Sequence, residues 1–252
     1  MKMKGMGKRN ASKYPCGGEL GMNPWTQMWL NYFPRAAKGN EAYFEKYRLD
    51  GFEKEHYVIR SALTELERGI RGMLVLPPPV HSSLAQAEKG TFVIRRISEA
   101  GSGVKTEGYH LKEQDGRLFL MAVEEKGVLY GVFELLRRIA MEESLKGVDA
   151  FCNPDNPNRM LNHWDNMDGS IERGYSGESF FFAENEILVN ERTRDYARFV
   201  ASVGLNGVVI NNVNVKDAAT YLITERYFDR VAELSNVFAD YGIRLYLSLN
   251  FA

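Results

Sequence analysis

The chain has 252 residues, of which 44% are apolar and 26% are charged, as in ordinary soluble globular proteins. This length allows one large domain or two of average size. The formal net charge of −1 gives no electrostatic reason to expect nucleic acid or an anionic membrane as a partner. No apolar run reaches the roughly 18 residues that a transmembrane helix needs.

The sequence also shows none of the short motifs that mark a secretory signal, a redox cysteine pair, a metal site or a nucleotide site. The basic N-terminus, MKMKGMGKRN, leads into no apolar segment, which favours a cytoplasmic over a secreted location. Cys16 and Cys152 form no CxxC pair and are interpreted as two buried free thiols. None of the four histidines has metal-site spacing, and neither a P-loop nor a convincing GxGxxG motif occurs.

The first half of the chain predicts mixed α and β structure. Residues 1–50 are rich in aromatic residues, but their period is too weak for an assignment. Apolar residues at helical spacing predict helices over about His56–Gly69 and Gly127–Glu143. Thr91–Ile97 is a β-branched strand candidate, and two further strands flank the turn dipeptide Asp115–Gly116. These elements predict a small sheet backed by helices.

A change of composition then separates the two halves. Residues 147–159, GVDAFCNPDNPNR, are rich in Pro, Asn and Asp and are interpreted as an interdomain linker. We therefore expect an N-terminal domain at residues 1–150 and a second domain at residues 151–252.

Strands and helices alternate in the second half. Strands are predicted at MLNHW, which begins at Met160, at Gly207–Val213 and at Arg244–Asn250. Amphipathic helices are expected between them, ending at Gly204 and Gly242. Apolar strands that alternate with helices are typical of a parallel sheet.

Each of these three strands ends in polar residues: the cluster Asn162–Asp168, the amides of Asn211–Asn214, and Asn250. Ligands bind at this end of the strands in (β/α)8 barrels and in doubly wound sheets. Asn and Asp are also ordinary turn residues, and this interpretation stays open for Asn211–Asn214. The first cluster differs because it contains His163 and Trp164, and an aromatic plate among amides and carboxylates is suited to a sugar.

At these residues the chain resembles the α-glucuronidases of glycoside hydrolase family 67. The matching stretches are NHWDNMDGSIERGYSG (162–177), DYARFVASVGLNGVVINNVN (195–214), LYLSLNFA (245–252) and, before them, KGVLYGVFELLRR (126–138). The match covers most of the chain from about Glu107 onward, and its first block is the most specific.

The resemblance implies an activity and a fold. Such enzymes remove glucuronic acid or 4-O-methyl-glucuronic acid from glucuronoxylo-oligosaccharides with inversion, and they need no metal or organic cofactor. We therefore expect a sandwich-like α/β N-terminal domain followed by the first three strands and two helices of a truncated (β/α)8 (TIM) barrel. The resemblance leaves room for a homodimer of the full-length protein, and the family includes both intracellular and secreted members.

The resemblance also implies site residues. Trp164 would pack against the uronic acid ring, and Val213 would line the same pocket. His163, Asn212 and Asn250 are added because of their positions at strand ends. The family's catalytic acid and base follow the region that this chain covers, so we expect no catalytic residue within it and no activity from the chain alone.

Two other functions stay open. The chain could be a carbohydrate-binding or accessory module in which the aromatic and amide cluster binds sugar without hydrolysis. It could also be an interaction domain in which Met1–Ala150 docks a partner chain that supplies the missing strands.

Overall fold

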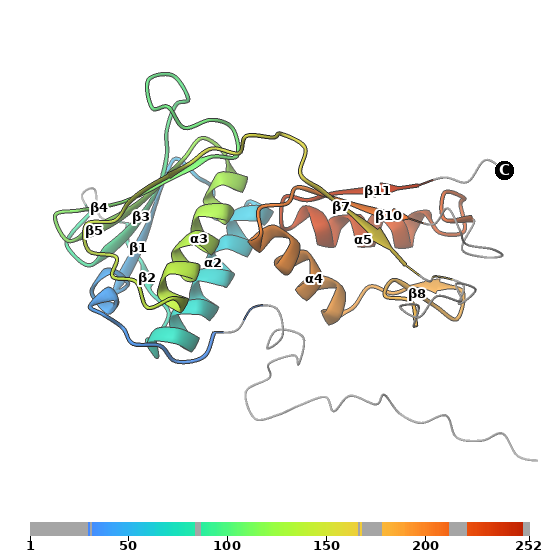
Figure 1. Ribbon diagram of the computed structural model, residues 1–252, viewed down its shortest axis with the longest axis horizontal. Coiled ribbons are helices and arrows are strands. Elements are labelled where there is room, and N and C mark those ends of the chain that lie inside the picture. Colours follow the sequence, from blue (N-terminus) through green and yellow to red (C-terminus); the bar gives the residue numbers. More distant parts are fainter. Residues whose placement is uncertain are drawn as a thin grey trace, which may run out of the picture.

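A computed structural model describes residues 30, 32–83, 87–165, 167, 178–211 and 221–248 (Figure 1). A six-stranded and a three-stranded sheet account for most of the strands, and helices lie between the two sheets (Figure 1). This is a mixed α/β fold with parallel pairing in both sheets. None of the helices in the described part of the chain is long and apolar enough to cross a membrane.

The larger sheet has the strand order β2-β1-β3-β5-β4-β6. Its strands are β1 (Lys46–Asp50), β2 (Val80–His81), β3 (Thr91–Arg96), β4 (Tyr109–Gln114), β5 (Arg117–Ala122) and β6 (Asp149–Cys152). Strands β2, β1, β3 and β5 pair in parallel, whereas β4 is antiparallel to both of its neighbours. The hairpin predicted at Asp115–Gly116 is confirmed, with φ values of 53° and 76° at these two residues, as a tight hairpin turn requires.

Two helices, α2 (Tyr57–Gly69) and α3 (Glu125–Ala140), cover one face of this sheet (Figure 1). A short 3-10 helix, η1 (Asn40–Tyr43), precedes β1, and a π-helical segment, η2 (Ile70–Leu74), continues α2. Helix α3 lies close to the sheet at a glycine. A Cβ at Gly131 of α3 would overlap Leu120 of β5.

The expected linker is partly wrong. Asp149–Cys152 forms β6, which pairs with β4 at one edge of the large sheet and crosses the expected boundary at residue 150. Composition could not reveal this strand because its side chains are mostly exposed and backbone hydrogen bonds hold it. The expected burial of Cys152 is also wrong, since this free thiol is exposed on the edge strand.

The smaller sheet has the order β11-β10-β7, with all strands parallel. Its strands are β7 (Met160–Trp164), β10 (Gly207–Asn211) and β11 (Arg244–Leu247). Helices α4 (Glu191–Ser202) and α5 (Phe228–Ala239) connect them and contact each other on one side of the sheet (Figure 1). This βαβαβ arrangement confirms the predicted strands and is the way a (β/α)8 barrel begins.

One element of this half was not predicted. Strands β8 (Phe182–Ala183) and β9 (Glu186–Ile187) form a short antiparallel hairpin before α4. The turn residues Glu184 and Asn185 both have positive φ, and the strands are too short to show an alternating pattern.

A buried ion network joins the two halves. Arg198 of α4 donates from Nε and Nη2 to the two carboxylate oxygens of Glu65 in α2, at 2.8 and 2.6 Å, and from Nη1 to Asp195 at 2.8 Å. The Arg198 and Glu65 side chains are each 1% exposed. Tyr32 donates its hydroxyl proton to Glu65 at 2.6 Å, and burial raises the pKa of this phenol. The network fixes α4 against α2.

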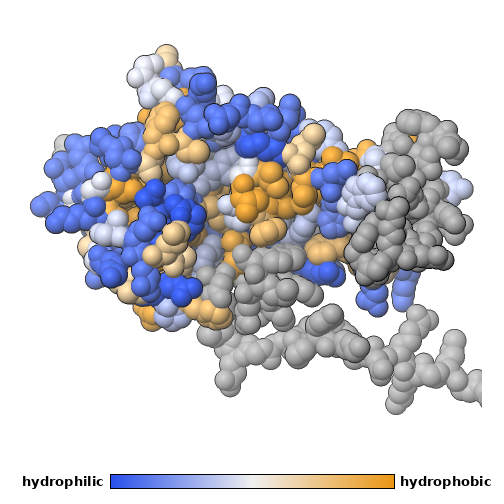
Figure 2. Space-filling view, in the orientation of Figure 1, coloured by the Kyte–Doolittle hydropathy of each residue, from blue (hydrophilic) through white to orange (hydrophobic). Residues whose placement is uncertain are grey.

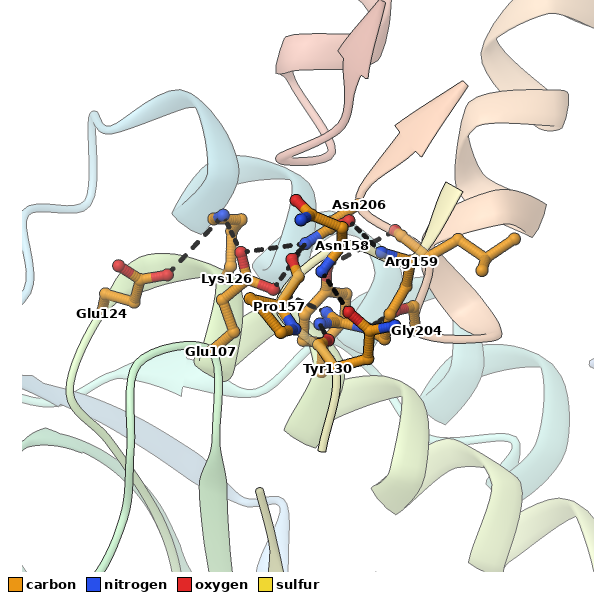
Figure 3. Close-up of polar contacts among 11 residues, drawn as sticks. Glu107, Glu124, Lys126, Tyr130, Pro157, Asn158, Arg159, Gly204 and Asn206 are labelled. Atoms are coloured by element: carbon orange, nitrogen blue, oxygen red, sulfur yellow. Dashed lines mark hydrogen bonds and ion pairs between the residues drawn. The ribbon is translucent and has the colours of Figure 1, made fainter. Parts of the chain in front are cut away.

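A second junction centres on Glu107, which precedes β4 (Figure 3). Its carboxylate accepts hydrogen bonds from Lys126, from Arg159 at 2.6 Å and from Asn206 at 3.0 Å. Burial alone would raise the pKa of Glu107, but the hydrogen bonds from Lys126 and Arg159 outweigh it and the pKa is lowered. Arg159 also donates to the carbonyl of Gly204 at 2.6 Å. These contacts attach the amino ends of β7 and β10 to the N-terminal half.

The buried network makes a stability prediction. Replacing Arg198→Met should lower the free energy of unfolding by about 3–5 kcal/mol, because Glu65 keeps a buried charge without its main partner. The double variant Glu65→Met/Arg198→Met should recover much of this loss. Urea unfolding followed by circular dichroism measures both effects.

The control is Arg71→Ala. Arg71 pairs with Glu67 at 3.5 Å on the exposed side of the same helical region, and its loss should cost less than about 1 kcal/mol. Equal small losses in Arg198→Met and Arg71→Ala would contradict the prediction.

Candidate sugar-binding site

Strand β7 places alternate side chains on opposite faces of the small sheet. His163 and Asp165, the residue that directly follows β7, lie on the side of the helices, where His163 is half-buried and Asp165 is buried. Trp164 points to the other face and is 54% exposed. His163 and Trp164, which were both predicted to bind the sugar, therefore lie on different faces.

The register of the three strands defines the face that carries Trp164. Asn162 of β7, Val209 of β10 and Tyr246 of β11 lie in one row across the sheet. Trp164 is one row further toward the carboxyl ends of the strands and is paired in register with Asn211. In a (β/α)8 barrel the face without helices points inward and its carboxyl edge forms the mouth of the active site.

The other predicted site residues lie outside the described residues. These are Asn212 and Val213, which follow β10, and Asn250, which follows β11. Most of the polar segment after β7, residues 166 and 168–177, also lies outside them. Of the five predicted site residues, the structure thus describes His163 and Trp164.

His163 is enclosed by aromatic rings on the helix side. Its Nδ1 lies 2.8 Å from the hydroxyl of Tyr196 in α4, and the two rings meet edge to face at 5.3 Å. The ring centroids of Phe181 and Phe180 lie 5.0 and 5.6 Å away. Burial lowers the pKa of His163, which keeps the imidazole neutral near pH 7.

Asp165 has contacts that sequence analysis did not reveal. Its carboxylate accepts hydrogen bonds from the Ser179 hydroxyl at 2.6 Å and from the backbone N–H groups of Phe180 and Phe181 at 2.8 and 3.0 Å. These donors come from a segment 14 to 16 residues later in the chain, so no local spacing marks them. The carboxylate thus anchors the segment before β8.

The described residues include no group of three or more His, Cys, Asp or Glu side chains that could hold a metal ion. A cavity of about 600 Å³ lies elsewhere, between α3, the edge of the large sheet and the end of α4. Figure 2 shows hydrophobic residues gathered on the surface between the two sheets. The cavity is lined by Arg159 and Gly204, at the amino ends of the barrel strands, and is distinct from the edge that carries Trp164.

Comparison with known proteins identifies the family. The profile of the glycosyl hydrolase family 67 N-terminus matches residues 28–135, and that of the family 67 middle domain matches residues 138–252. The chain belongs to glycoside hydrolase family 67.

Curated relatives of this family 67 chain are named as alpha-glucuronidases. It is 38% identical over 205 residues to a probable alpha-glucuronidase A of Aspergillus terreus, covering 77% of this chain and 24% of the relative. It is 40% identical over 170 residues to that of Aspergillus oryzae, covering 67% of this chain and 20% of the relative. The chain thus spans a quarter or less of these relatives' length.

Solved structures show the same fold at low sequence identity. A family GH115 4-O-methyl-alpha-glucuronidase aligns with a TM-score of 0.54 and 14% identity, over 81% of this chain and 28% of that one. A Streptomyces plicatus N-acetyl-beta-hexosaminidase aligns with a TM-score of 0.53 and 14% identity, over 86% of this chain and 43% of that one. Both are glycoside hydrolases, and the likeness concerns the fold.

The lowered pKa of His163 predicts a pH dependence of stability. The unfolded chain binds a proton at His163 near pH 6.5, whereas the folded chain does so only at lower pH. The stability that neutral His163 contributes is therefore complete above about pH 6.5. It is lost as the pH falls toward the pKa of His163 in the folded chain. Asp165 opposes this shift and Arg192 adds to it.

Replacing His163→Phe keeps an aromatic ring but removes the titrating group. The free energy of unfolding of this variant should depend less steeply on pH between about 6.5 and 5 than that of the unaltered chain. Urea unfolding at four or five pH values measures the difference. Parallel curves for the two proteins would show that His163 does not carry the effect.

Proposed function

We propose that this chain is part of an α-glucuronidase that hydrolyses the α-1,2 link between glucuronic or 4-O-methyl-glucuronic acid and xylo-oligosaccharides, with inversion, in xylan breakdown. The observation that supports this most strongly is the position of Trp164, half-exposed at the carboxyl end of the first barrel strand in a family 67 chain. The names of the curated relatives support the reaction.

Trp164 suits a sugar for a physical reason. An indole offers a large flat apolar surface that can cover the C–H face of a pyranose ring, while polar groups around it bind the hydroxyls. Trp164 is 54% exposed on the face of the small sheet opposite α4 and α5, and Asn162 lies one row below it on the same face. We propose that the uronic acid ring stacks on Trp164, with Val213 lining the same pocket.

Hydrolysis with inversion needs two further groups. A general acid and a general base must lie about 6.5–9.5 Å apart, with a water between the base and the sugar. Asp165 is the described carboxylate nearest to Trp164 in sequence, but it lies on the helix side and accepts three hydrogen bonds. We therefore propose that the acid and base come from parts of the family's barrel that these residues do not include, and that the chain alone binds without hydrolysing.

The binding proposal is tested with Trp164→Ala. Binding of glucuronic acid to the 252-residue chain should be weak and saturable, and the variant should bind roughly tenfold more weakly because the stacking surface is lost. Trp164→Phe should keep part of the affinity. Saturation-transfer NMR or calorimetry gives the dissociation constants.

A matched control is Tyr57→Ala, which removes an aromatic side chain of 45% exposure from the N-terminal half. This variant should bind glucuronic acid like the unaltered chain. Equal affinity of the Trp164→Ala variant and the unaltered chain would refute the role of Trp164.

The chain should release no glucuronic acid from xylo-oligosaccharides that carry it. The substrate and product are followed by NMR, which also reports the anomer that is formed first. Release of the β-anomer by the pure 252-residue chain would show that acid and base are present within it.

A further inference from the structure

Trp164 is exposed, yet its direction has to be fixed if it is to hold a sugar. Strand β7 lies at one edge of the small sheet and pairs with β10. Trp164 is 54% exposed, so packing covers less than half of its surface. The backbone on either side of Trp164 must then set the direction of its side chain.

On the carboxyl side, Asp165 fastens the backbone. Both of its carboxylate oxygens accept hydrogen bonds from residues 179–181, at 2.6 to 3.0 Å. Ser179 also accepts hydrogen bonds from the N–H groups of Phe181 and Phe182, at 3.2 and 2.8 Å, so the partner segment is itself held in a tight turn. Hydrogen bonds to a charged group are among the stronger ones in proteins.

On the amino side, His163 fastens the backbone to helix α4. The 2.8 Å contact between Nδ1 and the Tyr196 hydroxyl joins β7 to α4. The rings of Phe180 and Phe181 pack against both His163 and Tyr196. The guanidinium of Arg192 in α4 lies 4.0 Å from the centre of the Phe180 ring, a cation–π contact that also restrains this ring.

The two attachments meet at the same place. Residues 179–181 bond to Asp165 through their backbone and hydroxyl, and pack on His163 through the Phe180 and Phe181 rings. The residues before and after Trp164 are thus held by one segment on the helix side. Because side chains alternate along a strand, a backbone held at both neighbours points the side chain between them to the opposite face.

We propose that His163 and Asp165 are positioning residues that fix Trp164 on the inner face of the barrel. This proposal rests on the proposed role of Trp164 in binding the uronic acid ring. His163 and Asp165 contact protein groups on the helix side and act on the ligand through the indole.

The experiment observes Trp164 directly and without a sugar. The chain has three tryptophans, so a Trp25→Phe/Trp29→Phe background leaves Trp164 as the single emitter. In this background Asp165→Asn keeps the shape of the side chain but replaces one acceptor oxygen with a donor. Time-resolved fluorescence anisotropy should show the amplitude of local picosecond-to-nanosecond motion rising about twofold.

Tyr196→Phe tests the other attachment from a distance. It removes the hydroxyl that contacts His163 and leaves β7 itself unchanged. The amplitude should rise here too, and glucuronic acid should bind severalfold more weakly in both variants. Asp149→Asn, which removes a carboxylate that contacts His110 and Lys112 on the large sheet, is the matched control and should change neither quantity.

The outcomes separate positioning from simple stabilisation. If Asp165→Asn and Tyr196→Phe lower the urea midpoint while the local motion of Trp164 stays unchanged, the proposal is overturned. If Asp165→Asn does not fold, Ser179→Ala removes one donor to the same carboxylate and decides the question. If the motion rises but Trp164→Ala has unaltered affinity for glucuronic acid, positioning stands and the sugar-binding role of Trp164 fails.

Discussion

The structure depends on the placement of one buried guanidinium. Arg198 is 1% exposed, and the hydrogen bonds that Glu65 and Asp195 accept from it compensate its charge there. Since Glu65 lies on α2, the need to match this charge holds helix α4 of the second half against the N-terminal half. The same helix carries Tyr196 two residues before Arg198, and Tyr196 contacts His163 of β7. One helix therefore connects the packing of the two halves with the strand that presents Trp164.

The Glu107 cluster acts at the opposite end of the same strands. Its partners Arg159 and Asn206 stand just before β7 and β10, so these strands are fixed at their amino ends to the N-terminal half. At their carboxyl ends, Asp165 and the segment at Ser179 hold β7 from the helix side. Strand β7 is thus held at both ends, and the face that carries Trp164 takes no part in either attachment. Exposure of this face is compatible with a well-fixed backbone.

Sequence patterns predicted the elements that local periodicity determines. These elements include the helices α2 and α3 with their apolar stripes, the Asp115–Gly116 turn and the parallel strands of the second half. Strand β6 was not predicted because its pairing with β4 depends on backbone groups and not on an apolar pattern. The contact between Arg198 and Glu65 was not predicted because 133 residues separate them in the sequence. The roles of Asn212, Val213 and Asn250 lie outside the described residues and stay predictions.

The sequence alone could have predicted that His163 and Trp164 lie on opposite faces of the sheet. Both belong to the strand MLNHW, and a period of two places neighbouring residues on opposite faces. Treating Asn162–Asp168 as one polar cluster ignored this alternation. Among the described residues, the pleat places His163 and Asp165 on the side that holds the backbone and Asn162 and Trp164 on the other face. Asp165 belongs to the first side: its oxygens receive three donors from the segment at 179–181, and moving it toward a sugar would break all three bonds. Asp165 is therefore committed to the fold of the second half, and the residue of β7 that remains exposed at its carboxyl end is Trp164.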